Sequence, residues 1–293
     1  MPPRSSRSMR VSAAPSGLGA AGHNNYNIRA SAKYPPVRIV RIRVLVLPGS
    51  EKPQLAVEWL SGYLRAMGAE PLPEVLESLP GEELIRERLA GSDGVILVGA
   101  AGRPEVVRGA AAALGLGVEV NEDALNDTRA WYMDVEEPPE NLEDMALMPE
   151  FSYPVENPRG PVDGFVAMGL EDDRFVAATP PGFAESLEVF ELGIQDCVRR
   201  GTGRRYSATF SFQLLLGVEE ARRLAREVDE RFPSVFARLD GRFTDTGVPL
   251  VCTVYAATPE ELGRLHDEVR RFVEERSRGR IAATHGSSGG ELL

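Results

Sequence analysis

Five consecutive residues, Gly94 to Val98 (GVILV), constrain the fold of this 293-residue chain more than any other feature. Asp93 stands before this run and Gly99 after it, and a helix is predicted from about Pro104 to Leu114. A short apolar run without polar alternation is typical of a strand that is covered on both faces, as in parallel sheets. The sequence therefore predicts a buried parallel strand that is followed by a glycine-containing loop and a helix.

The residues before this strand follow the same alternation of strand and helix. Val37 to Leu47 (VRIVRIRVLVL) reads as a strand that ends in the turn Pro48-Gly49, and apolar residues recur at helical spacing from Leu55 to Leu64. Such alternation indicates a parallel sheet with right-handed crossovers, and ligands bind such sheets outside the carboxyl ends of the strands. The loops of interest are therefore Pro48 to Gln54 and Gly99 to Glu105.

A second unit is expected after residue 203. Apolar and polar residues alternate from Tyr206 to Leu216, which predicts a strand with one buried face. A helix, a hairpin of Val235 to Leu239 with Val248 to Ala256, and a helix opened by the capping box Thr258-Pro-Glu-Glu261 complete the order βαββα. We therefore expect a disordered tail or misassigned start (1–36), an α/β domain (37–203), an α+β subdomain (204–276) and a second disordered tail (277–293).

The N-terminal segment is rich in Ser, Ala, Gly and Arg, contains no acidic residue and has no hydrophobic period. This composition is typical of transit peptides. It also fits a disordered tail or an upstream start assigned ahead of the true one, with Met9 as an alternative start. We favour the last two interpretations, because the segment lacks a clear amphipathic helix.

Charge and cysteine usage exclude several classes of protein. The net charge is −11, and all 44 acidic residues but only 25 of the 33 basic ones lie beyond residue 50. Because such an acidic body repels polyanions, we expect no nucleic-acid partner. No stretch approaches the roughly eighteen apolar residues of a membrane span, so we expect no membrane contact. The two cysteines, Cys197 and Cys252, lie in apolar segments, which favours a cytoplasmic protein with buried thiols.

Short motifs occur in a set order in the middle of the chain. They are Met148-Pro-Glu150, Asn157-Pro-x-Gly160 and Gly164-Phe165, followed by Pro181-Gly182. In this order, and in its βαββα unit, the chain from about Arg41 to Arg276 resembles the CinA (competence/damage-inducible protein A) family. The family's C-terminal deamidase domain is not expected here, so the resemblance does not imply deamidation of nicotinamide nucleotides.

The resemblance implies a three-layer, parallel-sheet domain of the molybdopterin-binding (MoaB/Mog-like) type, followed by the small α+β subdomain. It further implies a small phosphorylated ligand, either a molybdopterin or a nucleotide, and a homo-oligomer. Related proteins are associated with Mg²⁺-dependent cleavage of nucleotide pyrophosphates such as ADP-ribose. In the family this chemistry depends on a Gly-Gly-Leu-Gly-Pro-Thr-x-Asp-Asp loop, whose amides hold phosphate and whose carboxylates hold the metal ion.

This sequence departs from the family at that loop. Residues 99–105 read Gly-Ala-Ala-Gly-Arg-Pro-Glu, so two glycines remain, the Thr is absent, and Glu105 is the one acid left. The first loop also differs, with Pro48-Gly49-Ser50-Glu51-Lys52 in place of a Gly-Asp-Glu turn. Glu105 is thus the candidate ligand for Mg²⁺, although an acid in the first turn of a helix is common for dipole reasons alone.

The candidate ligand-binding residues come from three loops, and each has a purely structural interpretation as well. The glycines could hold phosphate or form tight turns, Arg103 could pair with phosphate or be solvated, and the Asn157 loop could close over a ligand or be a structural turn. No arrangement of the three histidines or of a Ser/His/Asp set predicts catalysis, so catalytic residues are unknown. The candidates are Gly49, Ser50, Gly99, Gly102, Arg103, Asn157, Gly160 and Gly164.

Three functions remain open on the sequence. The first is a protein that binds molybdopterin or a nucleotide phosphate through a reduced phosphate loop. The second is a Mg²⁺-dependent nucleotide pyrophosphatase-like hydrolase, and the third is a catalytically silent oligomeric scaffold or regulator. We favour the first, because the family's pair of metal-binding acids is missing.

Overall fold

A six-stranded, mostly parallel sheet organises the first part of the chain. The computed structural model describes residues 39–170, 173–241 and 247–286. The strand order is β2-β1-β3-β8-β7-β6, in which the first four strands are parallel and the last two run antiparallel to their neighbours. The bounds are β1 Arg41–Val46, β2 Glu70–Val75, β3 Gly94–Val98, β6 Tyr153–Val155, β7 Gly164–Met168 and β8 Phe175–Thr179.

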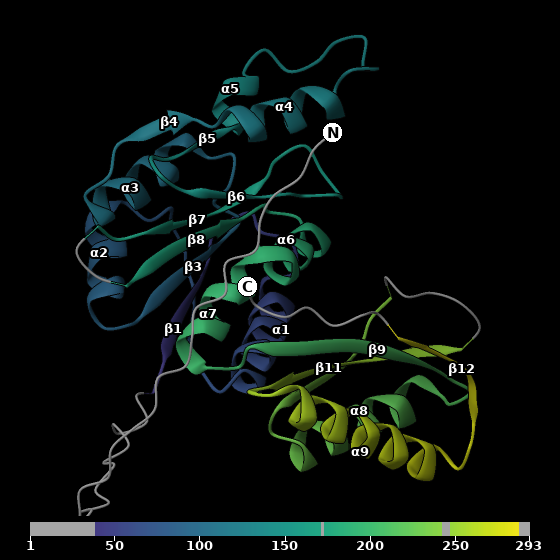
Figure 1. The fold of residues 1–293 in the computed structure, drawn as a ribbon. Coiled ribbons are helices and arrows are strands. Elements are labelled where there is room, and N and C mark those ends of the chain that lie inside the picture. Colours follow the sequence, from purple (N-terminus) through teal and green to yellow (C-terminus); the bar gives the residue numbers. More distant parts are fainter. Residues whose placement is uncertain (1–38, 171–172, 242–246, 287–293) are drawn as a thin grey trace, which may run out of the picture. The chain divides into compact units, whose positions relative to one another are not determined.

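Helices cover both faces of this sheet (Figure 1). One face packs against α1 (Pro53–Ala66), α6 (Phe183–Val189), the π-helical turn η1 (Phe190–Ile194) and α7 (Gln195–Thr202). The other face packs against α2 (Glu82–Ala90) and α3 (Pro104–Leu114). Every residue of β3 is buried, because this strand lies in the middle of the sheet with helices on both sides. The predicted bounds of β3 and α3 are confirmed.

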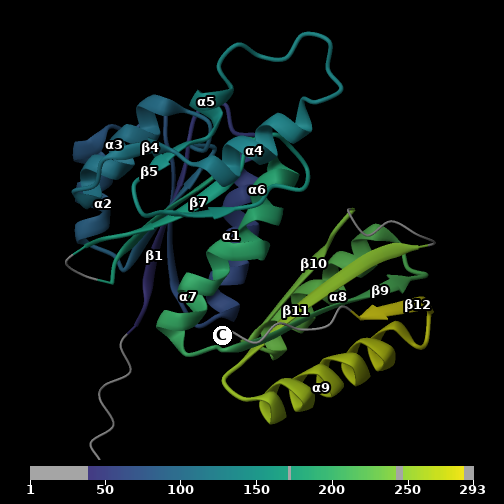
Figure 2. The same ribbon diagram turned by 45° about the horizontal axis from the view of Figure 1, so that its top comes forward.

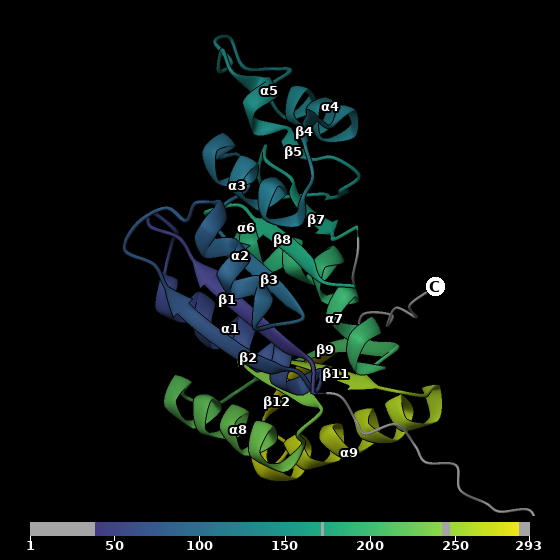
Figure 3. The ribbon, with the colours of Figure 1, turned by 90° about the vertical axis from the view of Figure 1, so that its left-hand side faces the viewer.

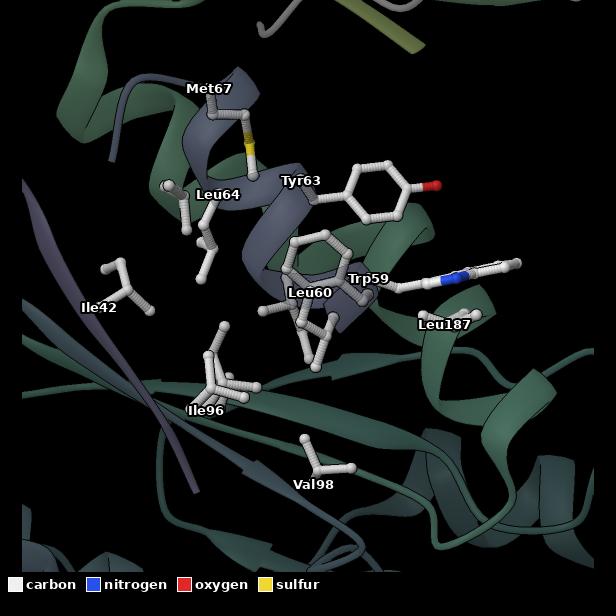
Figure 4. Close-up of a cluster of buried hydrophobic side chains, with 14 of the residues drawn as sticks. Ile42, Trp59, Leu60, Tyr63, Leu64, Met67, Ile96, Val98 and Leu187 are labelled. Carbon is white, nitrogen blue, oxygen red and sulfur yellow. The ribbon is translucent and has the colours of Figure 1, made fainter. Parts of the chain in front are cut away.

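The core beneath α1 shows how the apolar spacing of this helix is used. Figure 4 shows Leu60 and Leu64 directed toward Ile42 and Ile96 of the sheet, and all four side chains are fully buried. The same helix turns the Tyr63 ring to its side, where it meets Phe190 and Phe236 with ring centroids 5.3 and 4.7 Å away. Helix α1 therefore packs on the sheet with one stripe and on the subdomain with the next.

The acidic composition of residues 121–161 predicts an irregular segment, but the structure contains regular elements there. Asn121 accepts a hydrogen bond from the Ala124 amide and so caps α4 (Glu122–Trp131), which buries Ala124, Leu125 and Thr128. A four-residue helix, α5 (Leu142–Met145), follows, and β4 (Val118–Val120) pairs with β5 (Leu147–Pro149). The expectation was wrong because the cap and a short apolar stripe suffice for a helix that has α5 as a neighbour.

The second unit is a four-stranded antiparallel sheet in the order β10-β11-β9-β12. Helices α8 and α9 pack on one of its faces (Figures 2 and 3). The predicted hairpin of β10 with β11 is confirmed, and the Thr258 side chain accepts from the Glu261 amide at the start of α9, as the capping box predicts. The bounds are β9 Tyr206–Leu214, α8 Val218–Arg231, β10 Val235–Leu239, β11 Val248–Ala256, α9 Pro259–Ser277 and β12 Ile281–Gly286.

Two expectations about this unit are corrected. The tail expected from residue 277 begins instead with the last residue of α9 and continues as β12, which pairs with the free side of β9. The strand expected to have one buried face buries both in its second half, where Ser211 and Gln213 are as buried as Phe212. The second face is covered because Arg238 and Thr253 share it and the neighbouring Phe236 packs against α1.

The predictions for residues 1–36 lie outside the described residues. No helix in the described ranges is long and apolar enough to cross a membrane.

Candidate functional site

The first and third strands of the sheet form its topological switch point. The chain leaves β1 toward α1 on one face and leaves β3 toward α3 on the opposite face, while the two strands lie side by side. In open α/β sheets, ligands bind between loops that diverge in this way, outside the carboxyl ends of the strands. We use the word crevice for the region between these two loops. The structure therefore brings together the two loops that the sequence singled out, 48–54 and 99–105.

The side chain of Ser50, in the first loop, leaves room only for glycine at position 99. Ser50 donates from its Oγ to the Val98 carbonyl oxygen at 3.0 Å, and its side chain occupies the space where a Cβ of residue 99 would lie. Gly99 has a φ of +86°, in the left-handed region that favours glycine. Ser50 and Gly99 thus close the two loops against each other.

The second loop, 99–105, is held by hydrogen bonds to Thr179 and by a contact with Val162. The amides of Gly99 and Ala101 both donate to the Thr179 carbonyl oxygen, at 3.0 and 3.1 Å. Gly102 has a φ of +73°, and a Cβ built on it would lie 3.0 Å from Val162. The amides of Gly99 and Ala101 are therefore used within the protein, and a valine from the loop between β6 and β7 lies against Gly102.

Arg103 connects the two loops. Its Nη1 donates to the Pro48 carbonyl oxygen at 2.8 Å, and its Nη2 lies 3.2 Å from the position of a Cβ on Gly49. Gly49 has a φ of +80°. The Arg103 side chain is half-buried, and its Nη1 is used in the hydrogen bond to the first loop.

The acids at the crevice have different environments. Glu51 accepts a hydrogen bond from the Phe183 amide at 3.0 Å, and this bond, with Lys52 Nζ 3.0 Å from its other oxygen, lowers the pKa of Glu51. Glu51 therefore caps the start of α6. Glu105 is exposed in the first turn of α3. The described ranges contain no group of three or more His, Cys, Asp or Glu side chains that could hold a metal ion.

The loop that contains Asn157 is held by hydrogen bonds. Asn157 is buried, and its Nδ2 donates to the Val162 carbonyl oxygen at 3.0 Å and to Glu185 Oε2 at 2.8 Å. The Glu185 carboxylate lies where a Cβ of Gly160 or of Gly182 would fall, so both glycines are needed to seat it. The motifs Asn157-Pro-x-Gly160 and Pro181-Gly182 therefore meet at one side chain, Glu185, that the sequence did not single out.

Asp163 is a buried acid next to this loop. Its Oδ1 accepts the Asn157 amide at 2.9 Å, and the side chain is 4 % exposed. Burial raises the pKa of Asp163 to about 6 against the lowering effect of that amide, and the neighbouring carboxyls of Asp127 and Glu156 raise it further.

The structure thus collects most of the predicted site residues in one region. Gly49, Ser50, Gly99, Gly102 and Arg103 line the switch point, and Val162 links the Asn157 loop to Gly102. Gly164 serves the fold, because a Cβ there would overlap Val189 and lie 2.7 Å from the Ala178 carbonyl oxygen. Glu185 and Val162 could not be found from spacing, because their roles depend on segments far apart in the sequence.

Comparison with known proteins gives partial likenesses. No protein-family model matches the chain, and no curated protein matches it in sequence. Among solved structures it is similar to the protein CinA of Thermoplasma acidophilum, with 21% identity over 54% of this chain and 98% of that one, at a TM-score of 0.46. It is also similar to the molybdopterin biosynthesis enzyme MoaB of Thermus thermophilus (15% identity, 56% and 98% covered, TM-score 0.31). The tungsten cofactor synthesizing protein MoaB of Pyrococcus furiosus gives 13% identity, the same coverages and a TM-score of 0.31.

Proposed function

We propose that the crevice between the loops after β1 and β3 binds the anionic group of a small phosphorylated ligand, a molybdopterin or a nucleotide. The observation that carries this proposal is the switch point itself, where Gly99 and Gly102 adopt positive φ at the end of a buried parallel strand and lead into α3. The start of a helix after a glycine turn favours an anion, because the amides of its first turn carry partial positive charge. In α3, Pro104 has no N–H and the amides of Val106 and Val107 donate to the Arg103 carbonyl oxygen, so the first turn offers the Glu105 amide.

The groups left for such an anion are few and well defined. The Gly102 amide takes part in none of the hydrogen bonds found among residues 39–170, 173–241 and 247–286. Arg103 uses Nη1 on Pro48, which leaves Nη2 for an anion at the mouth of the crevice. A ligand phosphate would therefore sit between the Gly102 amide and the Arg103 guanidinium, with the first turn of α3 behind it.

The positions of the acidic residues favour binding of a phosphorylated ligand without its cleavage. Glu51 is held by the Phe183 amide and Lys52, and Glu105 is the one exposed acid in the first turn of α3. A Mg²⁺ ion would therefore have to enter with the ligand's phosphates, with Glu105 as its protein ligand, since Mg²⁺ often keeps few protein ligands. A pyrophosphatase would need a second acid for which the loop has no candidate.

A catalytically silent scaffold is the second candidate. It is favoured by the contacts of Ser50 with Val98, of Val162 with Gly102 and of Gly99 with Thr179, which satisfy the loops without any ligand. In that case the same architecture would serve assembly with further copies of the chain.

Thermal unfolding in the presence of ligands separates these functions. AMP, ADP-ribose, a molybdopterin precursor and inorganic phosphate are each added with and without Mg²⁺. A ligand at one hundred times its Kd adds about 2.7 kcal/mol of stability. Binding predicts a shift that Arg103→Gln reduces and that Arg108→Gln, an exposed arginine on the same helix, leaves unchanged.

Three other outcomes contradict the proposal. No shift with any of the four compounds would leave the scaffold. Release of AMP from ADP-ribose in the presence of Mg²⁺ would establish the hydrolase. A shift that is equal in the wild type and in Arg103→Gln would place the ligand elsewhere.

A further inference from the structure

A cavity of about 300 Å³ lies where the carboxyl-terminal half of α1 meets the α+β subdomain. It is at the other end of α1 from Lys52, so it is separate from the crevice described above. Its lining includes Gly62, Arg65 and Ala66 of α1, together with Asp229 of α8 and with Val235 and Phe236 of β10. Residues 65 and 66 lie one helical turn after residue 62, so a single face of α1 forms one wall of the cavity.

The apolar part of the cavity is rigidly built. The Phe236 ring packs on Gly62 so closely that a Cβ at position 62 would lie within 2.8 Å of the ring, so only glycine allows this approach. The same ring contacts Tyr63 at a centroid distance of 4.7 Å and Trp59 at 6.5 Å. Val235 and Phe236 are both buried. The cavity therefore has a fixed apolar floor at the junction of the two units.

Two charged groups face this floor. Asp229 is half-buried, and its Oδ1 accepts the Ala237 amide at 2.7 Å, which fixes the carboxyl and leaves Oδ2 for another donor. Arg65 is exposed at the rim, and its guanidinium makes no hydrogen bond or ion pair within the described residues. Both helices end beside the cavity, α1 at Ala66 and α8 at Arg231, and helix carboxyl ends favour a cation.

We propose that this cavity binds a small zwitterion with an apolar side chain, such as a free α-amino acid. The ammonium group pairs with Asp229, the carboxylate pairs with Arg65, and the side chain packs on Val235 and Phe236. The volume is at the lower end of the range for small-molecule sites, which suits a ligand as small as an amino acid. The same cavity is lined by one fixed acid, one arginine without a partner in the described residues and an apolar surface, so each of the three parts of such a ligand has a partner there.

The charge of Asp229 gives the site a pH dependence. Burial raises the pKa of Asp229 to about 7, although the Ala237 amide and the positive charge of Arg238 both lower it. The charged groups around it are Arg238 on β10, Glu230 on its own helix and Arg65, which lines the same cavity. An ammonium group binds the ionised carboxyl, so affinity rises between pH 6 and pH 8 and binding near pH 6 releases a proton.

Calorimetric titration of the full chain at pH 8 tests the proposal. The probes are L-leucine, L-methionine and L-phenylalanine, with 3-methylbutylamine and 4-methylpentanoate as analogues of leucine that lack one charged group. At least one amino acid binds saturably, and when that one is leucine, each analogue binds at least tenfold more weakly. Asp229→Asn keeps an oxygen for the Ala237 amide, and Arg65→Gln changes an exposed residue, so both variants should fold.

Each of these variants should weaken binding of the amino acid at least tenfold, and Arg108→Gln should leave it unchanged. The proposal is overturned if none of the three amino acids binds, if either analogue equals leucine, or if Asp229→Asn binds as tightly as the wild type. Buffers of different ionisation enthalpy provide a second measurement, because proton release at pH 6 should disappear in Asp229→Asn. None of these results depends on whether the crevice near Gly102 binds phosphate.

Discussion

Arg103 donates from Nη1 to the carbonyl oxygen of Pro48 at 2.8 Å, across 55 residues of sequence. Arg103, a candidate for pairing with a phosphate, thus also holds the two switch-point loops together. A side chain fixed at one edge is preorganised at the other, which lowers the cost of ordering it around a ligand. The same bond explains how the loops keep their arrangement when no ligand is bound.

Replacing Arg103 by Gln should therefore cost stability as well as affinity. The loss of a hydrogen bond from a charged donor predicts a decrease of about 1.5 kcal/mol or more in the free energy of unfolding. Urea denaturation measures this decrease. Arg108→Gln on the same helix should change it by less than about 0.5 kcal/mol, since it is exposed. Equal stabilities of the two variants would mean that the Pro48 contact contributes nothing.

Gly102 and Gly115 offer a matched pair of substitutions. Both have positive φ, +73° and +74°, but a Cβ on Gly102 lies 3.0 Å from Val162, whereas nothing lies within 4 Å of one on Gly115. Gly115→Ala should cost about 1–2 kcal/mol from the left-handed conformation alone. Gly102→Ala should cost about 1 kcal/mol more from crowding. Adding Val162→Ala to Gly102→Ala should remove that excess, as a double-mutant cycle by urea denaturation would detect.

Asp163 predicts a pH dependence of stability. Because its pKa in the folded protein, about 6, lies above the ordinary value of 3.8, its contribution is fully present below about pH 4 and is lost as the pH rises through 6. Between pH 4 and pH 7.5 the free energy of unfolding of the wild type should therefore fall by about 2–3 kcal/mol more than that of Asp163→Asn. The exposed Asp123→Asn on α4 serves as the control. A parallel pH profile of wild type and Asp163→Asn would contradict the assignment.

Replacing Glu185 should lower the stability of the protein more than replacing another acid in the first turn of a helix. Glu185→Ala removes the acceptor of a buried Asn157 N–H, which predicts a loss of about 1–3 kcal/mol. Glu105 also stands in the first turn of a helix, so Glu105→Ala controls for the helix dipole and should cost about 0.3–1 kcal/mol. Thermal unfolding of the two variants side by side decides the comparison.

The sequence predicted those elements whose formation is local. β3 and α3 were found to the residue, because an unbroken apolar run and a Pro-started helix ended by Gly115 depend on neighbours in the chain. β12 was missed because Ile281–Gly286 has little apolar character, and its strand arises from pairing with the free side of β9. α4 was missed because its apolar stripe is short and the segment around it is acidic.

The candidate site also combines local features that the sequence predicts with contacts between distant segments that it does not predict. The sequence predicts a turn at Pro48-Gly49 and leaves Gly99 and Gly102 open between a phosphate site and tight turns. All three glycines have positive φ. The partners of Ser50, Arg103 and Glu51 could not be predicted, because each lies on another strand end or helix. Loop 99–105 is therefore a turn held by internal hydrogen bonds, in which the Gly102 amide and the Nη2 edge of Arg103 take part in no hydrogen bond within the described residues.

The central claim is that an anionic ligand binds between the Gly102 amide and the Arg103 guanidinium. The most direct measurement follows backbone amide resonances in a two-dimensional NMR spectrum while AMP, ADP-ribose or a molybdopterin precursor is added. Binding between these two groups predicts saturable shifts centred on Gly49, Gly102 and Glu105, which Arg103→Gln weakens and Arg108→Gln does not. Saturable shifts that leave these three amides unmoved, or no shifts with any of the three compounds, would contradict it.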